Sequence, residues 1–190
     1  MKIYTISLLS ITAAIKFEAS DLINWGNQND DVMGGISTGE NDICSDNSDL
    51  MCFHGTIRTE NNGGFASLKG QFNGLDISDA KKLKINAQER KATGDNECVE
   101  YAVSLMDRGR FYCFGGCYFL QTIQFCNEMG VSKVKLSDFD RSTLNIMGRR
   151  MPSWLAWDLD TSDIRSFWLY AMKPGIIGDF ELAIESVEFA

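Results

Sequence analysis

The sequence has little of several things on which common protein functions depend: one histidine and two prolines in 190 residues, and no run of basic side chains. With His54 as the single histidine, the usual nucleophile–base–orienter set of acyl-transfer enzymes is not available. The 26 acidic side chains outnumber the 18 basic ones and give a net charge of −8. Because such a protein repels phosphate backbones, the sequence predicts no nucleic-acid partner.

No apolar run is long enough to span a bilayer, which takes about 20 residues, so we expect no transmembrane helix. The first residues nevertheless differ from the rest, because Lys2 precedes a largely apolar run from Ile3 to Ile15 and small residues follow it. This order is typical of a secretory signal. We interpret residues 1–19 as a signal-like segment with cleavage between Ala14 and Ser20, which predicts a secretory or extracellular location. A mitochondrial presequence is the alternative.

The cysteines fit an oxidising compartment, because their number is even and no CxxC motif of a zinc or redox site occurs. The six residues are Cys44, Cys52, Cys98, Cys113, Cys117 and Cys126. They predict up to three disulfides, with 15 possible pairings, against the alternative of thiols in a reducing compartment. Because the last three flank aromatic-rich segments, we expect their partners to lie across the fold.

Helical stripes of twelve or more residues are also missing, and period-two alternation of apolar and polar residues dominates. At the C-terminus the apolar phase slips by one residue to Val187 and Phe189, which predicts a β-bulge. The predicted strands lie within residues 82–87, 101–106, 133–136 and 180–185, and at Leu50–Phe53, Phe65–Leu68, Phe111–Phe114, Tyr118–Ile123 and Phe167–Ala171. With Gly, Asn and Asp turns between them, they indicate one all-β domain over residues 21–190, a jelly-roll β-sandwich.

Several short motifs suggest chemistry, but each has a structural explanation. Residues 35–39 match the GxSxG nucleophile elbow without its βαβ context, so we interpret Ser37 as a loop or strand-start serine. Residues 158–163 begin like a calcium loop but lack its glycine and glutamate. Carboxylates for glycoside hydrolysis would come from Asp30, Asp31, Asp138 and Asp140, and a sugar-stacking surface from Trp25, Trp154, Trp157 and Trp168. We expect no catalytic residue, no metal site and no cofactor.

Two segments have a composition that generic strands or loops do not explain, since each places consecutive glycines between Asn or Asp residues and an apolar residue. Glycine pairs allow close approach of backbones, and Asn and Asp cap tight turns. We therefore predict that Asn29-Asp30 and residues 60–62 form one hydrogen-bonded cluster. The candidate binding or structural residues are Trp25, Asn29, Asp30, Met33, Gly34, Gly35, Glu60, Asn61, Asn62, Gly63, Gly64, Phe65 and Lys69.

These segments resemble the hallmark of the NADH:ubiquinone oxidoreductase (complex I) intermediate-associated protein 30 family. Its first motif, W-x-x-x-N-D-x-V-M-G-G-x-S, is matched from Trp25 to Ser37, and its second, around T-E-N-N-G-G-F-A-S, from Phe53 to Ser67. Similar closing segments extend the resemblance to Phe189. The resemblance implies a galactose-binding-like β-sandwich, and the best-known members are mitochondrial chaperones that assist complex I assembly without a catalytic role.

The chain departs from the family pattern in its signal-like N-terminus, in its six cysteines and at Lys69, where arginine is usual. Lysine keeps the charge but loses bidentate pairing with a carboxylate such as Glu60 or Asp30, which we expect it to neutralise. The resemblance implies a non-enzymatic binding or chaperone module that takes a protein partner. A secreted carbohydrate-binding module, with a glycan as partner, is the alternative, and a carboxylate hydrolase a third.

Overall fold

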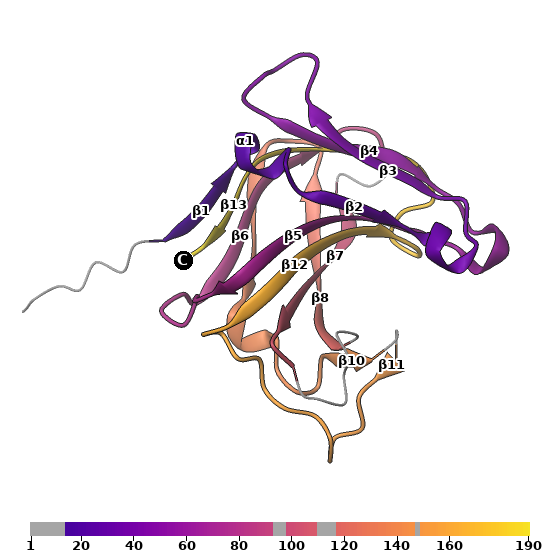
Figure 1. Cartoon of the computed structure of the whole chain (residues 1–190). Helices are drawn as coiled ribbons and strands as arrows, with labels where there is room; N and C mark the ends of the chain where they lie inside the picture. Colours follow the sequence, from indigo (N-terminus) through magenta and orange to yellow (C-terminus); the bar gives the residue numbers. More distant parts are fainter. Residues whose placement is uncertain (1–13, 93–97, 110–116, 147–148) are drawn as a thin grey trace, which may run out of the picture.

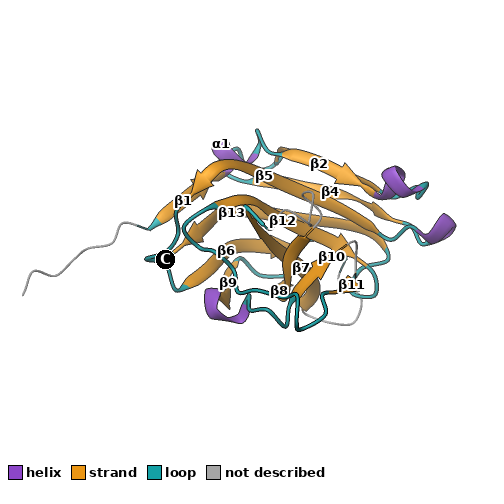
Figure 2. Ribbon diagram, turned by 60° about the horizontal axis from the view of Figure 1, so that its bottom comes forward, coloured by secondary structure: helices purple, strands orange, loops and turns teal. Residues whose placement is uncertain are grey.

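The computed structural model describes residues 14–92, 98–109, 117–146 and 149–190. Two antiparallel sheets pack face to face, as Figures 1 and 2 show, which confirms the all-β sandwich prediction. The predicted strand Phe111–Phe114 and Cys113 lie outside the described residues. The elements are β1 Ile15–Glu18, α1 Ala19–Leu22, β2 Gly26–Asn29, η1 Asp30–Met33, β3 Thr38–Ile43, β4 Met51–Ile57, η2 Glu60–Asn62, β5 Phe65–Leu75, β6 Lys82–Glu89, β7 Cys98–Asp107, β8 Cys117–Cys126, β9 Gly130–Lys135, η3 Leu136–Asp138, β10 Leu144–Ile146, β11 Arg149–Arg150, β12 Ile164–Met172 and β13 Gly178–Phe189.

The strand order explains how distant segments meet. One sheet runs β3-β4-β13-β6-β9, with β1 beside the end of β13, and the other runs β11-β10-β8-β7-β12-β5-β2. Because β2 pairs with β5 and β3 pairs with β4, the connections β2–β3 and β4–β5 cross between the sheets side by side. The connection β12–β13 crosses at the same end, since Met172 lies opposite Phe65 and Gly178 opposite Ile57.

The core lies between the two sheets and follows the alternation of the sequence. On β6, Leu83, Ile85 and Ala87 are buried, as predicted. The slip near the C-terminus is a register shift between Ile184 and Ser186 where β13 pairs with β6, which confirms the predicted bulge. In the other sheet, β7 is buried on both faces, so that Ser104 is as inaccessible as the core-facing residues. This burial departs from the half-exposed strand that alternation predicts.

The first described strand, β1, lies within the segment that the sequence marks as signal-like. Ile15 to Glu18 pair with Phe189 to Ser186. The ring of Phe17 stacks on Phe72 and meets Trp25 edge to face. No helix among the described residues has the length and apolar character needed to cross a membrane.

Two disulfides tie neighbouring strands. Cys44–Cys52 closes the β3–β4 hairpin, and Cys98–Cys126 joins directly opposite residues of β7 and β8. Cys117 is also disulfide-bonded. The expectation that the partner of Cys126 lies across the fold is wrong, because the register of β7 and β8 already brings Cys98 opposite to it. Disulfides of this kind indicate an oxidising environment.

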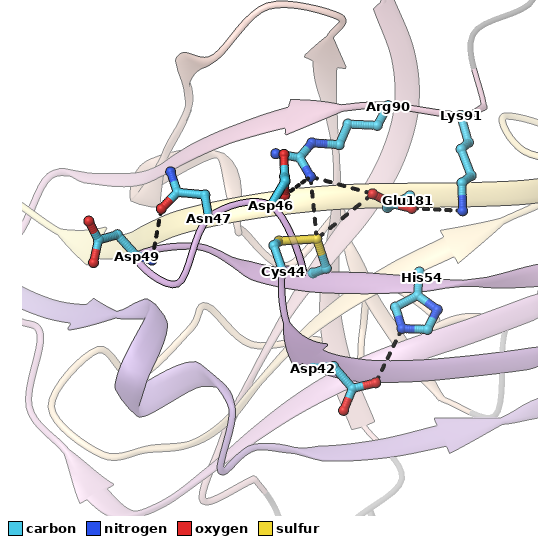
Figure 3. The surroundings of a disulfide bond; sticks show 10 residues. Asp42, Cys44, Asp46, Asn47, Asp49, His54, Arg90, Lys91 and Glu181 are labelled. Carbon is cyan, nitrogen blue, oxygen red and sulfur yellow. Dashed lines mark hydrogen bonds and ion pairs between the residues drawn. A yellow bond between two sulfur atoms is a disulfide. The ribbon is translucent and has the colours of Figure 1, made fainter.

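Polar groups surround the Cys44–Cys52 bridge at the surface of the hairpin (Figure 3). The Arg90 guanidinium lies 3.0 Å from Asp46, 3.5 Å from Glu181 and 3.7 Å from the Cys52 sulfur. Lys91 forms a second ion pair with Glu181, at 2.7 Å. These ion pairs fix the hairpin loop onto β13 and onto the residues that follow β6.

Candidate functional site: the crossover end of the sandwich

The candidate site is the end of the sandwich where three connections run side by side: residues 30–37, 58–64 and 173–177, called here the crossover end. Figure 1 shows η1 and η2 projecting together at this end, and Figure 2 shows the same two helices beside each other from another side. The predicted contact between the two glycine-rich segments is present here. The structure shows that one buried side chain in particular joins them.

That side chain is Asp30, which is fully buried at the start of η1. Its carboxylate accepts hydrogen bonds from the Ser37 amide at 2.9 Å and the Ser37 hydroxyl at 2.5 Å. From the second segment it accepts bonds from the amides of Gly64 at 2.6 Å and Phe65 at 3.3 Å. Asp30 therefore joins the β2–β3 connection to the β4–β5 connection through neutral donors.

Burial by itself would raise the pKa of Asp30, because it disfavours the charged carboxylate. The hydrogen bonds from Ser37, Gly64 and Phe65 outweigh that effect and hold the pKa below its ordinary value. Asp30 is therefore charged at neutral pH. Its charge is balanced by backbone and hydroxyl dipoles rather than by a cation.

The glycines of both segments leave room for this carboxylate. A Cβ atom at Gly35 would overlap the Asp30 carboxyl group, and one at Gly63 would lie 2.5 Å from its Oδ2 atom. Gly34 ends η1 with a φ of +83°, a conformation that favours glycine. The side chain of Lys173, from the third connection, fills the space beside Gly64.

The other predicted residues are placed differently. Glu60 points into solvent and lies 3.8 Å from Arg58, so its carboxylate takes no part in the Asp30 cluster. Exposed Asn61 has a φ of 56°, and the Asn29 side-chain amide donates to the Gly39 carbonyl at 3.4 Å. Trp25 packs on the ring of Phe167, away from this cluster. The cluster is thus narrower than predicted, because the second segment bonds to Asp30 through the backbone amides of Gly64 and Phe65.

The role expected of Lys69 is wrong. Its ammonium lies 4.3 Å above the ring of Trp168, its cross-strand neighbour, and within the described part of the chain it forms no ion pair. Desolvation lowers the pKa of this amine. Trp168 in turn stacks on Tyr170 with an interplanar angle of 3°. Lys69 belongs to the outer face of the seven-stranded sheet, at the strand position opposite Gly26.

Exposed apolar side chains surround the Asp30 cluster, and the sequence reasoning missed most of them. Ser37 links their segments, since its hydroxyl donates to Asp30 and accepts from the Arg58 amide at 3.0 Å. Beside them, a hollow of about 400 Å³ lies between residues 56–60 and 177–179. The exposed fractions are 63% for Val32, 62% for Met33, 51% for Ile36 and 68% for Ile177. An apolar pair inside a polar turn was the signal that could have identified Val32.

Several of the carboxylates considered for hydrolysis or calcium binding have partners within the protein, whereas Asp31 is exposed on η1. Asp140 accepts from the amide and hydroxyl of Ser142, and Asp160 from those of Ser162. Asp158 pairs with Arg141 at 2.7 Å. No group of three or more His, Cys, Asp or Glu side chains suited to a metal ion occurs among the residues the structure describes. Ser37 is buried and bonded to Asp30, which agrees with its interpretation as a structural serine.

Comparison with solved structures gives carbohydrate-binding folds. A family 11 carbohydrate-binding module from Clostridium thermocellum, in complex with a β-1,3-1,4-mixed-linked tetrasaccharide, has a TM-score of 0.66 and 14% identity, covering 95% of this chain and 96% of that chain. A family 30 carbohydrate-binding module has a TM-score of 0.58 and 11% identity, over 94% and 87%. The agarase AgWH50C matches with a TM-score of 0.56 and 12% identity, over 94% of this chain but 25% of the agarase. These likenesses confirm the galactose-binding-like jelly-roll fold.

Comparison with curated protein sequences finds no match. The profile of the complex I intermediate-associated protein 30 family matches residues 15–184. This range includes the Asp30 cluster, all three connections of the crossover end and both disulfides that the structure describes. The chain therefore belongs to the complex I intermediate-associated protein 30 family.

Proposed function

We propose that this protein is a non-enzymatic binding module that docks on a protein partner through the crossover end, in the assembly-factor role that the name of its family states. The carrying observation is the combination of exposed Val32, Met33 and Ile36 with the buried Asp30 that fixes their loop. Exposed apolar side chains on a rigid loop lose little conformational entropy on binding. A few residues at the centre of an interface carry most of its binding free energy, so a compact apolar group can serve as the anchor of an interface.

Binding rather than catalysis is supported by how the reactive side chains are used. The two groups that resemble a nucleophile and its acid, Ser37 and Asp30, are buried and satisfied by each other and by backbone amides. His54 lies on β4 and contacts Asp42 at 3.4 Å, on a different part of the molecule. These side chains have structural partners that account for them.

The docking proposal is tested with a surface variant, Val32→Ser with Met33→Ser, against a control, Val131→Ser, which removes an apolar side chain at β9 that is also exposed, by 51%. Tagged proteins are recovered from cells of the native source, and the proteins that co-purify with the wild type, whether complex I subunits or others, are quantified by mass spectrometry. We expect the amount of partner recovered with the double variant to fall at least tenfold, and the amount recovered with the control to stay at the wild-type level. Equal recovery by both variants would contradict docking at the crossover end.

We further propose an oxidising compartment of the secretory pathway as the location, supported by the disulfides and by the signal-like segment. The family name points instead to mitochondria, where complex I resides. Imaging of the C-terminally tagged full chain in its own cell, with markers for both compartments, distinguishes the two. A mitochondrial signal would contradict the secretory assignment.

A second function, glycan binding, is favoured by one observation: Trp154 is 80% exposed. The turn that carries it is fixed by hydrogen bonds from the Leu155 and Ala156 amides to the Pro152 carbonyl, at 2.9 and 3.1 Å. The ring is therefore held in contact with solvent. Trp168, on the outer sheet face, is only 8% exposed and is covered by Lys69 and Tyr170, so it offers no open ring face for a sugar.

Glycan binding is tested by calorimetry with a mixed-linked β-glucan oligosaccharide, the ligand class of the family 11 module. Binding that is lost in Trp154→Ala and retained in Trp168→Phe would favour this function over protein docking. Absence of binding at millimolar oligosaccharide would exclude this ligand.

A further inference from the structure

We propose that the chain is processed by hydrolysis of the peptide bond between Ala14 and Ile15, so that the mature protein begins with the first residue of β1. This cleavage is a step of maturation, and it does not depend on which partner binds the crossover end. It rests on where the sandwich begins, on which residues precede each candidate bond, and on the cavity that receives the new N-terminus.

The strand β1 belongs to the folded sandwich. All four of its residues pair with β13, from Ile15 opposite Phe189 to Glu18 opposite Ser186. Lys16 also forms an ion pair with Glu18 at 2.8 Å, and the Glu18 amide donates to the Asp21 carboxylate at 3.0 Å. Cleavage after Ala19 would remove this strand and leave the end of β13 without a partner on that side.

Removal of β1 would also remove the aromatic contacts of Phe17. Phe17 contacts Phe72 at a ring distance of 5.4 Å and Trp25 at 5.5 Å, and Trp25 contacts Phe167 in the core at 5.5 Å. Without Phe17, one side of Trp25 would be open to water. A processing site within β1 or α1 is therefore incompatible with the structure that the rest of the chain forms.

The residues before each candidate bond also bear on the position of the cut. Signal cleavage requires small side chains at the first and third positions before the bond. The bond after Ala14 meets this requirement, with Thr12 at the third position. The bond after Ala19 places the aromatic ring of Phe17 there, and the bond after Ser20 places the charged Glu18 there. Residues 1–14 are slightly fewer than the about 15–30 residues typical of such segments.

The charge of the new N-terminus also fits its surroundings. Hydrolysis adds water across the bond, which leaves a carboxylate on Ala14 and a protonated amine on Ile15. In the folded protein Ala14 and Ile15 line a cavity of about 240 Å³ together with Asp76, Asp79 and the C-terminal Ala190. Two acidic residues, Asp76 and Asp79, therefore line the cavity in which the new ammonium group would lie, and they match it in charge.

The C-terminal side of this cavity is fixed. The Lys81 and Lys82 amides both donate to the Ala190 carbonyl group at 2.8 Å, and the Ala190 amide donates to the Lys82 carbonyl at 2.9 Å. Asp76 is likewise held, because its carboxylate accepts from the amide and hydroxyl of Ser78. Ile15 and Ala190 thus line the same cavity.

The experiment is translation of the full 190-residue chain with and without endoplasmic-reticulum membranes, followed by mass spectrometry of the N-terminal peptide. We expect a membrane-dependent product that begins with Ile15. A product that begins with Ser20 or Asp21, or one that retains residues 1–14, would overturn the proposal.

Two variants sharpen the result, and because the readout is cleavage itself, neither has to fold. Ala14→Arg places a large charged side chain directly before the proposed bond and is expected to reduce processing at least tenfold. Ala19→Arg makes the same change before the alternative bond and is expected to leave processing at Ile15 unchanged. Loss of processing in the second variant alone would assign the cut to the bond after Ala19 and contradict the proposal.

Discussion

Single buried carboxylates organise the loops of this protein, each by accepting hydrogen bonds from backbone amides. Asp30 does so at the crossover end, Glu89 at the last position of β6 and Asp107 at the last position of β7. A carboxylate in this position satisfies several orphan amides at once, which costs desolvation but fixes a loop that has no regular structure. Their donors are the amides of Ser37, Gly64 and Phe65 for Asp30, those of Arg90, Lys91, Ala92 and Glu181 for Glu89, and those of Gly109 and Asp160, with the Trp157 indole, for Asp107.

At Asp30, the change to asparagine should destabilise the protein by about 2–3 kcal/mol, because charge-assisted bonds are lost and the new NH2 group faces amide donors. The measurement is the free energy of unfolding from urea denaturation. Asp31→Asn is the matched control, since Asp31 is the exposed neighbour on the same turn of η1. An equal effect of the two substitutions would show that burial and bonding of Asp30 contribute nothing.

The effect of Asp30→Asn should also depend on pH in a defined direction. Because the folded-state pKa of Asp30 is lowered, its contribution is fully present above the unfolded pKa of about 3.9. It is lost as the pH falls through the lower, folded-state pKa. The stability difference between wild type and variant should therefore be constant from about pH 8 to 5 and shrink below about pH 4. A difference that grows on acidification would contradict this assignment.

Gly63→Ala should cost about 1–3 kcal/mol, because the new methyl group collides with the Asp30 carboxylate, which four hydrogen bonds hold in place. Thermal unfolding followed by circular dichroism measures the loss. Gly26→Ala is the control, since a Cβ atom there meets no atom within 4 Å. We expect that control to change stability by less than about 0.5 kcal/mol.

At the scale of elements, the two disulfides should differ in what they contribute. Cys98–Cys126 closes a loop of 28 residues and Cys44–Cys52 a loop of 8. On the chain-entropy account, loss of the longer loop costs about 3–4 kcal/mol and loss of the shorter one about 2–3. Double alanine variants of each pair, compared by urea denaturation, give the order. A larger loss for the Cys44–Cys52 variant would indicate that its contacts with Arg90 matter more than loop entropy.

The strands could be predicted because their alternation is strong over six or more residues, as on β6 and β13, where even the bulge was visible. Short elements such as β1, β10 and β11 carry too few residues for a period to show. The segment around Asp30 could be identified from the sequence, because an acidic residue close to a pair of glycines is an unusual composition for a strand or a loop. The position of Lys69 could not, because it depends on the register of β5 against β12, which links residues about 100 apart.

At the scale of the whole molecule, a high negative charge is combined with exposed apolar side chains. The chain carries a net charge of −8, yet four exposed apolar side chains lie at the crossover end. A partner held there should be bound mainly by apolar contacts, so we expect Kd to change by less than about threefold between 50 and 500 mM salt. Titration of the purified partner at both salt concentrations measures this. A hundredfold weakening would show that charge pairing carries the interaction.

The position of β13 has a consequence for how the protein is made. This last strand lies at the centre of its sheet and pairs with β1, β4 and β6, so the sheet lacks its middle until the final residues are available. While the ribosome still holds the C-terminal end, the earlier strands of that sheet have no common partner. The sandwich therefore closes only after β13 has left the ribosome, and a chain that crosses a membrane before that point crosses it unfolded.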